Sequence, residues 1–154
     1  MRKHEFFKYI SIAVVIITTI AVRIYKIDRP LWLDELFGYS LAKLGPEAII
    51  QNSWTDPHPP FYYLMQWIVL SPDHTRSEIV WRWIPLLCGV LVVFNIGIIV
   101  KRITDSFTGI IVCLIAATLP SLVLYSQEAR PFSSLVLLTS LSAWITVTLL
   151  RNTF

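Results

Sequence analysis

The sequence predicts an all-α membrane protein, with about four transmembrane helices and one or two juxtamembrane helices in a long first external loop. Of its 154 residues, 55% are hydrophobic and only 15% are charged, whereas about a quarter of the residues in a soluble domain are charged. The charged residues are also missing from four long apolar runs. A soluble domain of this length could not bury such runs on every side, so the composition excludes a soluble protein.

The four apolar runs predict the spans in chain order. Three of them cover residues 83–100, 106–127 and 131–150, each close to the roughly 20 residues that cross about 30 Å of hydrocarbon. The first run, 9–22, is shorter, but Lys8 and Arg23 flank it, and long basic side chains can extend to the interface. No small-x-small cleavage pattern follows it, so we predict a retained anchor and not a signal peptide. The predicted spans are residues 7–25, 81–100, 107–126 and 131–150.

The external loop, residues 26–80, is predicted to contain two short helices. The first covers residues 34–44, with Asp34 as its N-cap and Gly45-Pro46 at its end. The second covers residues 59–70 and starts at a proline pair. This segment is too short for a span and is typical of an interfacial helix.

The basic residues of the short segments predict the orientation. With four spans, the following residues fall on one side of the membrane: Arg2, Lys3, Lys8, Lys101, Arg102 and Arg151. The positive-inside rule assigns this side to the cytoplasm. We therefore expect a multi-pass protein of the plasma membrane with a cytoplasmic amino terminus, and with loops 26–80 and 126–130 together on the outer face.

Three polar clusters lie on that outer face, at residues 31–35, 56–60 and 125–131. Each has a structural interpretation, because carboxylates cap helices, prolines start them, and turns between spans need polar residues. Each also has a functional interpretation, because a carboxylate at the membrane edge can act as a general base or bind a metal. Arginine holds phosphate through bidentate bonds, and Arg82 and Arg130 lie at the same membrane depth. Carboxylates and arginines beside an apolar groove suit a lipid-linked phosphate substrate.

The order of four motifs resembles the polytopic GT-C glycosyltransferases. The nearest likeness is their bacterial and archaeal branch, which is related to protein O-mannosyltransferases and aminoarabinose transferases. The motifs are Trp-x-Asp-Glu at 32–35, His-Pro-Pro-x-Tyr-Tyr-Leu at 58–64, Arg-x-x-Pro at 82–85 and Ser-Gln-Glu-Ala-Arg-Pro-Phe at 126–132. Each motif alone is common, but their order over about a hundred residues is specific.

The resemblance implies a membrane enzyme that takes a sugar from a polyprenyl-phosphate donor. It passes the sugar to a lipid, glycan or protein acceptor on the outer face. It also implies roles for individual residues: Asp34 as catalytic base with Glu35 in support, Arg82 and Arg130 against the carrier phosphate, His58 and Tyr62 in the substrate site, and Glu128 as a second acidic position. A divalent metal, held by Asp34 and Glu128, is the one cofactor that the resemblance leaves open.

Transferases of this kind are typically several times longer, so we expect this chain to be their amino-terminal part, present as a truncated fragment. Two alternatives are a transferase completed by a second subunit and a non-catalytic membrane scaffold or lipid-carrier-binding protein. A transporter is not expected, because the runs carry no ionisable residue at mid-membrane. Nucleic acid is not an expected partner either, because the net charge of +3 reflects membrane orientation and not a basic patch.

Overall fold

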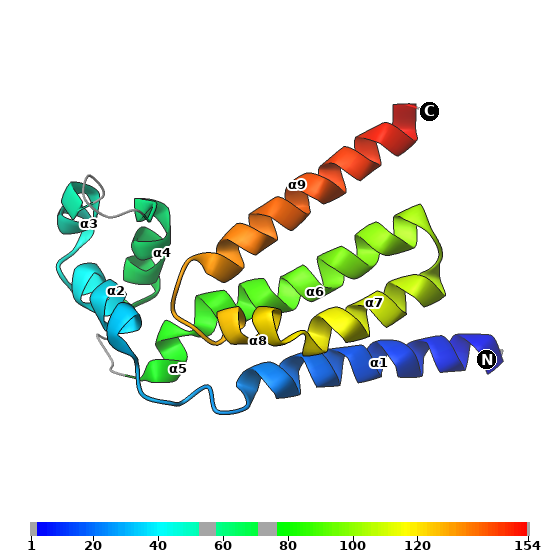
Figure 1. Ribbon diagram of the computed structural model, residues 1–154, viewed down its shortest axis with the longest axis horizontal. Coiled ribbons are helices and arrows are strands. Elements are labelled where there is room, and N and C mark those ends of the chain that lie inside the picture. The colour runs from blue at the N-terminus through cyan, green and yellow to red at the C-terminus, as the bar shows by residue number, and fades with distance from the viewer. Residues whose placement is uncertain (1–2, 53–57, 71–76, 154) are drawn as a thin grey trace.

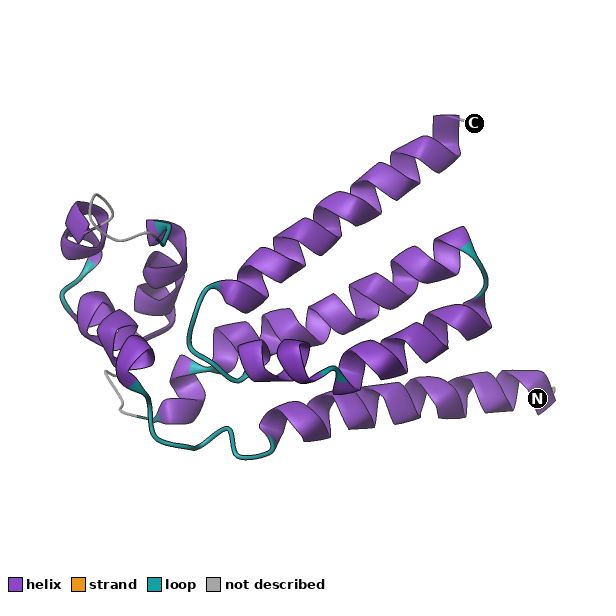
Figure 2. Cartoon of the chain, viewed as in Figure 1, coloured by secondary structure: helices purple, strands orange, loops and turns teal. Residues whose placement is uncertain are grey.

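The computed structural model describes residues 3–52, 58–70 and 77–153, and this part of the chain is helical with connecting loops and no strand. The helices are α1 (Lys3–Ile24), α2 (Leu33–Lys43), α3 (Pro46–Asn52), α4 (Pro60–Leu70), α5 (Glu78–Trp81), α6 (Trp83–Ile103), α7 (Ser106–Thr118), α8 (Pro120–Ser126) and α9 (Phe132–Thr153). Figures 1 and 2 show two parts: a bundle of long helices, and a group of short helices at one end of it.

The bundle confirms the predicted class of fold. Helices α1, α6 and α9 are each long and apolar enough to cross a membrane, and α7 with α8 makes a fourth span if this bent pair is counted as one. Both chain ends and the α6–α7 turn lie at the same end of the bundle, whereas α2–α5 and the α8–α9 loop lie at the other (Figure 1). The outer-face loops of the prediction therefore do meet at one end, as four spans require.

The helix bounds differ from the predicted span limits at several points. Helix α6 begins at Trp83, two residues after the predicted limit at 81, because the chain turns at Arg82 between α5 and α6. The third span bends by 60° before Pro120, since the residue preceding a proline disfavours the helical conformation. The last helix continues to Thr153, beyond the predicted end at 150.

The short helices also differ in detail from the prediction. Helix α2 begins at Leu33 with Trp32 as N-cap, so the assignment of Asp34 as N-cap is wrong. The end of α2 is as predicted, with Gly45 at a φ of +92°, a conformation that glycine adopts most readily. Helix α4 closely matches the predicted interfacial segment, whereas the sequence analysis missed α3 and α5.

Arg23 does not extend to the interface as predicted. Its side chain is fully buried, and Nη1 donates to the carbonyl oxygens of Thr19, 3.3 Å away, and Ala117, 3.0 Å away. Ala117 lies in the last turn of α7, where the bend before Pro120 leaves carbonyl groups without intrahelical donors. The arginine therefore ties α1 to the bend.

Helix α6 lies at the centre of the bundle and packs against α1, α7, α8 and α9. Glycines allow the closest approaches, as is common between membrane helices. A Cβ atom on Gly97 would lie 2.0 Å from Cys113 Sγ of α7, and one on Gly89 would lie 2.3 Å from Ser126 Cβ of α8. These contacts fix the position of α7 and α8 along α6, and with it the position of the loop after α8 relative to the start of α6.

Candidate functional site

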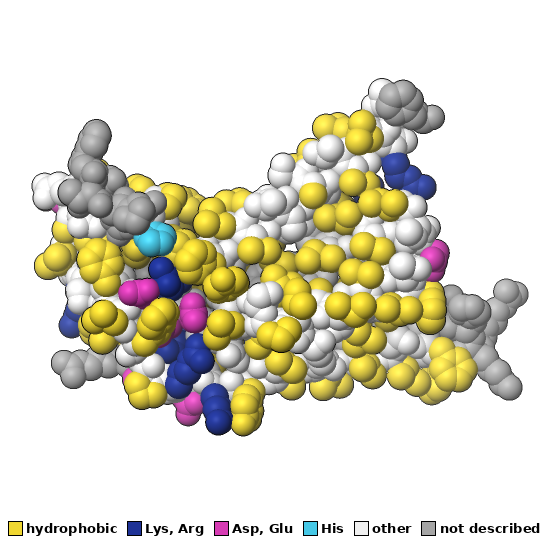
Figure 3. Space-filling view, viewed as in Figure 1, with side chains coloured by type: hydrophobic (Ala, Val, Ile, Leu, Met, Phe, Trp, Pro, Cys, Tyr) yellow, Lys and Arg dark blue, Asp and Glu magenta, His cyan; other side chains and the backbone are white. Residues whose placement is uncertain are grey.

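Charged side chains gather at the end of the molecule that carries the short helices, whereas the visible flank of the bundle is apolar (Figure 3). Two ion pairs organise this end. The first joins Arg82 to Glu35 and is called the buried pair, because both side chains have an exposed fraction of 0%. The second joins Arg130 to Asp34 and is called the exposed pair, with side chains 20% and 44% exposed.

Arg82 uses all its hydrogen-bond donors within the protein. Nε donates to Glu35 Oε1 at 2.9 Å and Nη2 to Glu35 Oε2 at 2.6 Å. Nη1 donates to the carbonyl oxygens of Ile27 and Arg29, both at 2.6 Å, and Nη2 also donates to that of Pro30 at 3.3 Å. A guanidinium has five N–H groups, so none is left for a carrier phosphate. This geometry favours a structural role over the predicted phosphate-binding role.

Glu35 is equally occupied. Beyond Arg82, Oε1 accepts from the backbone N–H of Ala129 at 2.7 Å, and Oε2 accepts from that of Trp32 at 3.2 Å. Burial alone would raise the pKa of this carboxyl, but the hydrogen bonds and the charge of Arg82 outweigh it and hold the pKa below its ordinary value. The carboxylate thus joins α2, the α1–α2 loop, the start of α6 and the α8–α9 loop, and it has no exposed edge for the predicted catalytic role.

Asp34 points away from this buried network, although it is the neighbouring residue. Its Oδ2 lies 2.9 Å from Arg130 Nη1. The Arg130 guanidinium also lies 4.7 Å from the centre of the Phe132 ring and 5.7 Å from that of Trp32, within the range of cation–π attraction. The exposed pair therefore combines a solvent-exposed carboxylate with a partly exposed arginine that packs against two aromatic side chains.

A recess with a volume of about 300 Å³ opens beside Trp32, lined by Arg29, Pro30, Trp32, Leu124 and Glu128. Burial, followed by the negative charge of Glu35, raises the pKa of Glu128 above its ordinary value, while Arg130, Arg29 and Arg82 oppose the shift. Arg29 and Leu124 were not among the predicted site residues, because no motif connects them to the acidic residues. Their place in the recess follows from the α1–α2 loop lying against α8.

The raised pKa of Glu128 predicts a pH effect on stability. The native state holds this proton more tightly than the unfolded chain, so the stabilisation is complete below the unfolded pKa of about 4.3 and is lost as the pH rises through the native pKa. We expect Glu128→Gln to unfold at a higher temperature than the wild type near pH 8, with the difference shrinking toward pH 4. Thermal unfolding in detergent from pH 4 to pH 8 measures this.

The matched control is Glu47→Gln, which changes an exposed glutamate in α3. It should leave the pH dependence unchanged. A Glu128→Gln curve parallel to that of the wild type at all pH values would contradict the assignment.

Gln127 holds the α8–α9 loop to the end of α1, a role that the sequence analysis did not assign. Its Nε2 lies 3.0 Å, 3.1 Å and 2.9 Å from the carbonyl oxygens of Val22, Arg23 and Tyr25. These carbonyl groups lie at or just beyond the last turn of α1, where intrahelical donors run out. The only signal in the sequence was an amide in a short loop between two spans.

The two remaining predicted site residues lie in different surroundings. Tyr62 is buried in the core of the short helices, and its hydroxyl oxygen accepts from Gln66 Nε2 at 3.0 Å. This enclosure favours a packing role over the predicted substrate contact. His58 is partly exposed, and its ring centre lies 6.3 Å from that of Phe132 in an edge-on arrangement. The fold thus brings His58 close to the aromatic ring against which Arg130 packs.

The metal assignment stays a prediction. Within residues 3–52, 58–70 and 77–153, no group of three or more His, Cys, Asp or Glu side chains could hold a metal ion. Asp34 and Glu128 would contribute two carboxylates at most, and the Asp34 carboxylate already faces Arg130.

Residues 57–153 match the family described as dolichyl-phosphate-mannose-protein mannosyltransferases, and this match covers more than half of the chain. Neither a curated protein nor a solved structure matches the chain. The matched range contains His58, Arg82 and the whole α8–α9 loop, whereas the Asp34-Glu35 motif precedes it.

Proposed function

The chain belongs to the family of dolichyl-phosphate-mannose-protein mannosyltransferases, and on this premise we propose that it transfers a sugar from a polyprenyl-phosphate donor to an acceptor on the non-cytoplasmic face. The observation that carries the proposal is the exposed pair. It combines a solvent-accessible carboxylate and a solvent-accessible arginine beside the recess, at the end of the bundle where the outer-face loops meet.

In the proposed reaction, Asp34 accepts the proton of an acceptor hydroxyl. The acceptor oxygen forms a bond to the anomeric carbon of the sugar, and the bond from that carbon to the phosphate oxygen breaks. The polyprenyl phosphate leaves with the electron pair, and the charge that develops on it is stabilised by Arg130. A general base and a fixed cation are what this step needs, since an alcohol is a weak nucleophile and the leaving group is anionic.

The ion pair favours binding of the donor before the acceptor. While Arg130 holds Asp34 at 2.9 Å, Oδ2 of the aspartate is in contact with the guanidinium and is not free to contact an acceptor hydroxyl. A donor phosphate would compete for the guanidinium, which binds phosphate through the same paired N–H groups. Donor binding would thereby release Asp34 for the acceptor hydroxyl. Trp32 and Leu124, both exposed, offer apolar surface at this point for the first isoprene units.

The donor assay tests this function through Arg130. We expect Arg130→Gln to raise the KM for the polyprenyl-phosphate sugar by roughly 10- to 100-fold, because a charge-assisted bond to the donor phosphate is lost. Initial rates of transfer of labelled sugar are measured against donor concentration in membranes that contain the chain. A mannosyl donor is the first to use, since mannose is the sugar in the family description.

Lys43→Gln is the matched control, because Lys43 is an exposed cation at the end of α2, away from the exposed pair. It should leave the KM unchanged. An unchanged KM in Arg130→Gln would overturn the role of Arg130. Donor binding that depends on Arg130, without transfer to any lipid, glycan or protein acceptor, would instead favour a non-catalytic protein that binds the lipid carrier.

A further inference from the structure

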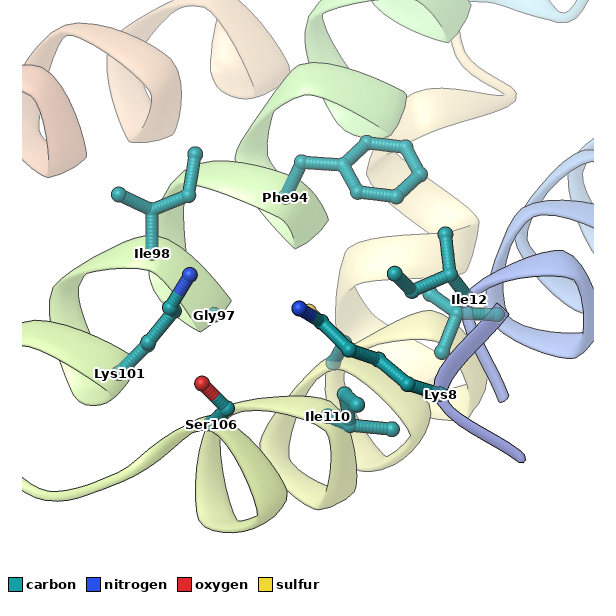
Figure 4. A pocket seen from close by; sticks show the side chains of 11 residues that line it. Lys8, Ile12, Phe94, Gly97, Ile98, Lys101, Ser106 and Ile110 are labelled. Carbon is teal, nitrogen blue, oxygen red and sulfur yellow. The ribbon is translucent and has the colours of Figure 1, made fainter. Parts of the chain in front are cut away.

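A second pocket lies at the opposite end of the bundle, between α1, α6 and α7. Its volume is about 210 Å³. Lys8 of α1, Lys101 of α6 and Ser106 of α7 extend their polar atoms into the same space, as Figure 4 shows. The proposed transfer reaction makes no use of these residues.

The rest of the pocket lining is apolar. It consists of aliphatic and aromatic side chains, two glycines and a cysteine, and includes Ile12, Phe94 and Ile110. From Lys101 to Phe94 the lining follows α6 for two helical turns, or about 10 Å. The pocket therefore runs from the end of a span into the apolar part of the bundle, with its polar groups at one end.

The charges at the polar end are not balanced by acidic side chains, since none of the described lining residues is acidic. Asp105, which directly precedes Ser106, bonds to its own helix. Its Oδ1 accepts from the backbone N–H groups of Phe107 and Thr108, and its Oδ2 accepts from the Thr108 hydroxyl. Among the described lining residues, therefore, no side chain offsets the positive charge of the two ammonium groups.

We propose that this pocket binds an anionic glycerophospholipid of the surrounding bilayer. The phosphate lies between Lys8 and Lys101 and accepts a hydrogen bond from Ser106, and the first part of an acyl chain fills the apolar lining. Three features match this ligand. Two cations lie on α1 and α6, a hydroxyl donor lies on α7, and the apolar lining begins at the end of a span. Basic pockets between membrane helices recognise lipid headgroups through this chemistry.

The test is a lipid titration of the purified chain in detergent, followed by native mass spectrometry with phosphatidylglycerol and phosphatidylcholine. We expect preferential binding of phosphatidylglycerol, and roughly 10- to 30-fold weaker binding in the Lys8→Gln/Lys101→Gln double variant. The Lys8→Arg/Lys101→Arg variant keeps both charges and should bind as the wild type does. Arg151→Gln, which removes a cation at the same end of the bundle, should also leave binding unchanged.

A filling variant separates the pocket from general surface charge. Ile12→Trp keeps both lysines but places a large ring in the apolar lining, so phosphatidylglycerol binding should fall here as well. Equal binding of the two lipids, or no loss in Ile12→Trp, would overturn the proposal. Competition by inorganic phosphate at concentrations matched to the lipid would also overturn it, by identifying a simple anion site.

Discussion

Asp34→Asn is expected to lower the rate of sugar transfer by roughly 10²- to 10⁴-fold, the range over which a positioned general base contributes. The change keeps the size of the side chain and its place in the first turn of α2. It removes the negative charge, and with it the capacity to accept the proton of the acceptor hydroxyl. Initial rates at saturating donor, in membranes that contain the chain, give the effect on kcat.

Loss of folding would not account for that result. The exposed pair is in contact with solvent, with side chains 20% and 44% exposed, and ion pairs near the surface contribute only about 0 to 1 kcal/mol to stability. Asp34→Asn should therefore unfold at nearly the wild-type temperature. Asp28→Asn, at an exposed position in the α1–α2 loop, is the matched control and should retain activity. Wild-type transfer by Asp34→Asn would refute the assignment of the base.

Arg82→Met is expected to destabilise the fold by about 3–5 kcal/mol, the cost of leaving a buried carboxylate without its partner. The reciprocal change, Glu35→Gln, leaves the buried arginine without a counter-charge and should cost a similar amount. The double variant Glu35→Gln/Arg82→Met leaves no unpaired charge at these two positions, so its stability should exceed that of either single variant. Thermal unfolding of the four proteins in detergent supplies the double-mutant cycle.

The same cycle distinguishes a structural from a catalytic role for these two residues. If Arg82→Met kept its unfolding temperature but lost donor binding, the phosphate-binding role predicted from the sequence would be right. The lowered pKa of Glu35 adds a pH dependence, because its stabilisation is present above about pH 4.3 and is lost as the pH falls through the native pKa. Glu35→Gln should remove that dependence.

Membrane insertion made most of the fold predictable. A span has to be apolar over about 20 residues, so the runs without charge identify α1, α6 and α9, and the α7–α8 pair, directly. The motifs likewise identified the GT-C glycosyltransferase family, which the match over residues 57–153 confirms. The short helices were harder, because α3 and α5 have seven and four residues and too few positions to establish a helical period.

Some features of the site follow from the local sequence, and others depend on tertiary contacts. The motifs named the acidic and basic residues, but they did not state which acid pairs with which arginine. Asp34 and Glu35 follow each other in the first turn of α2, and successive residues of a helix point about 100° apart. One therefore turns inward to Arg82 and the other outward to Arg130. The predicted helix, with Asp34 as its N-cap, did not indicate that these two side chains point in different directions.

By itself, the sequence determined that the chain crosses a membrane and that its polar motifs gather at one end of a helical bundle, because hydrocarbon imposes apolar length on every span. Only the tertiary structure decided that Glu35 and Arg82 are buried with their hydrogen-bonding groups occupied, while Asp34 is exposed and Arg130 is partly exposed. That difference depends on carbonyl groups of the α1–α2 loop and on an N–H group of the α8–α9 loop. Backbone groups of this kind carry no sequence signature, so their partners are determined by packing.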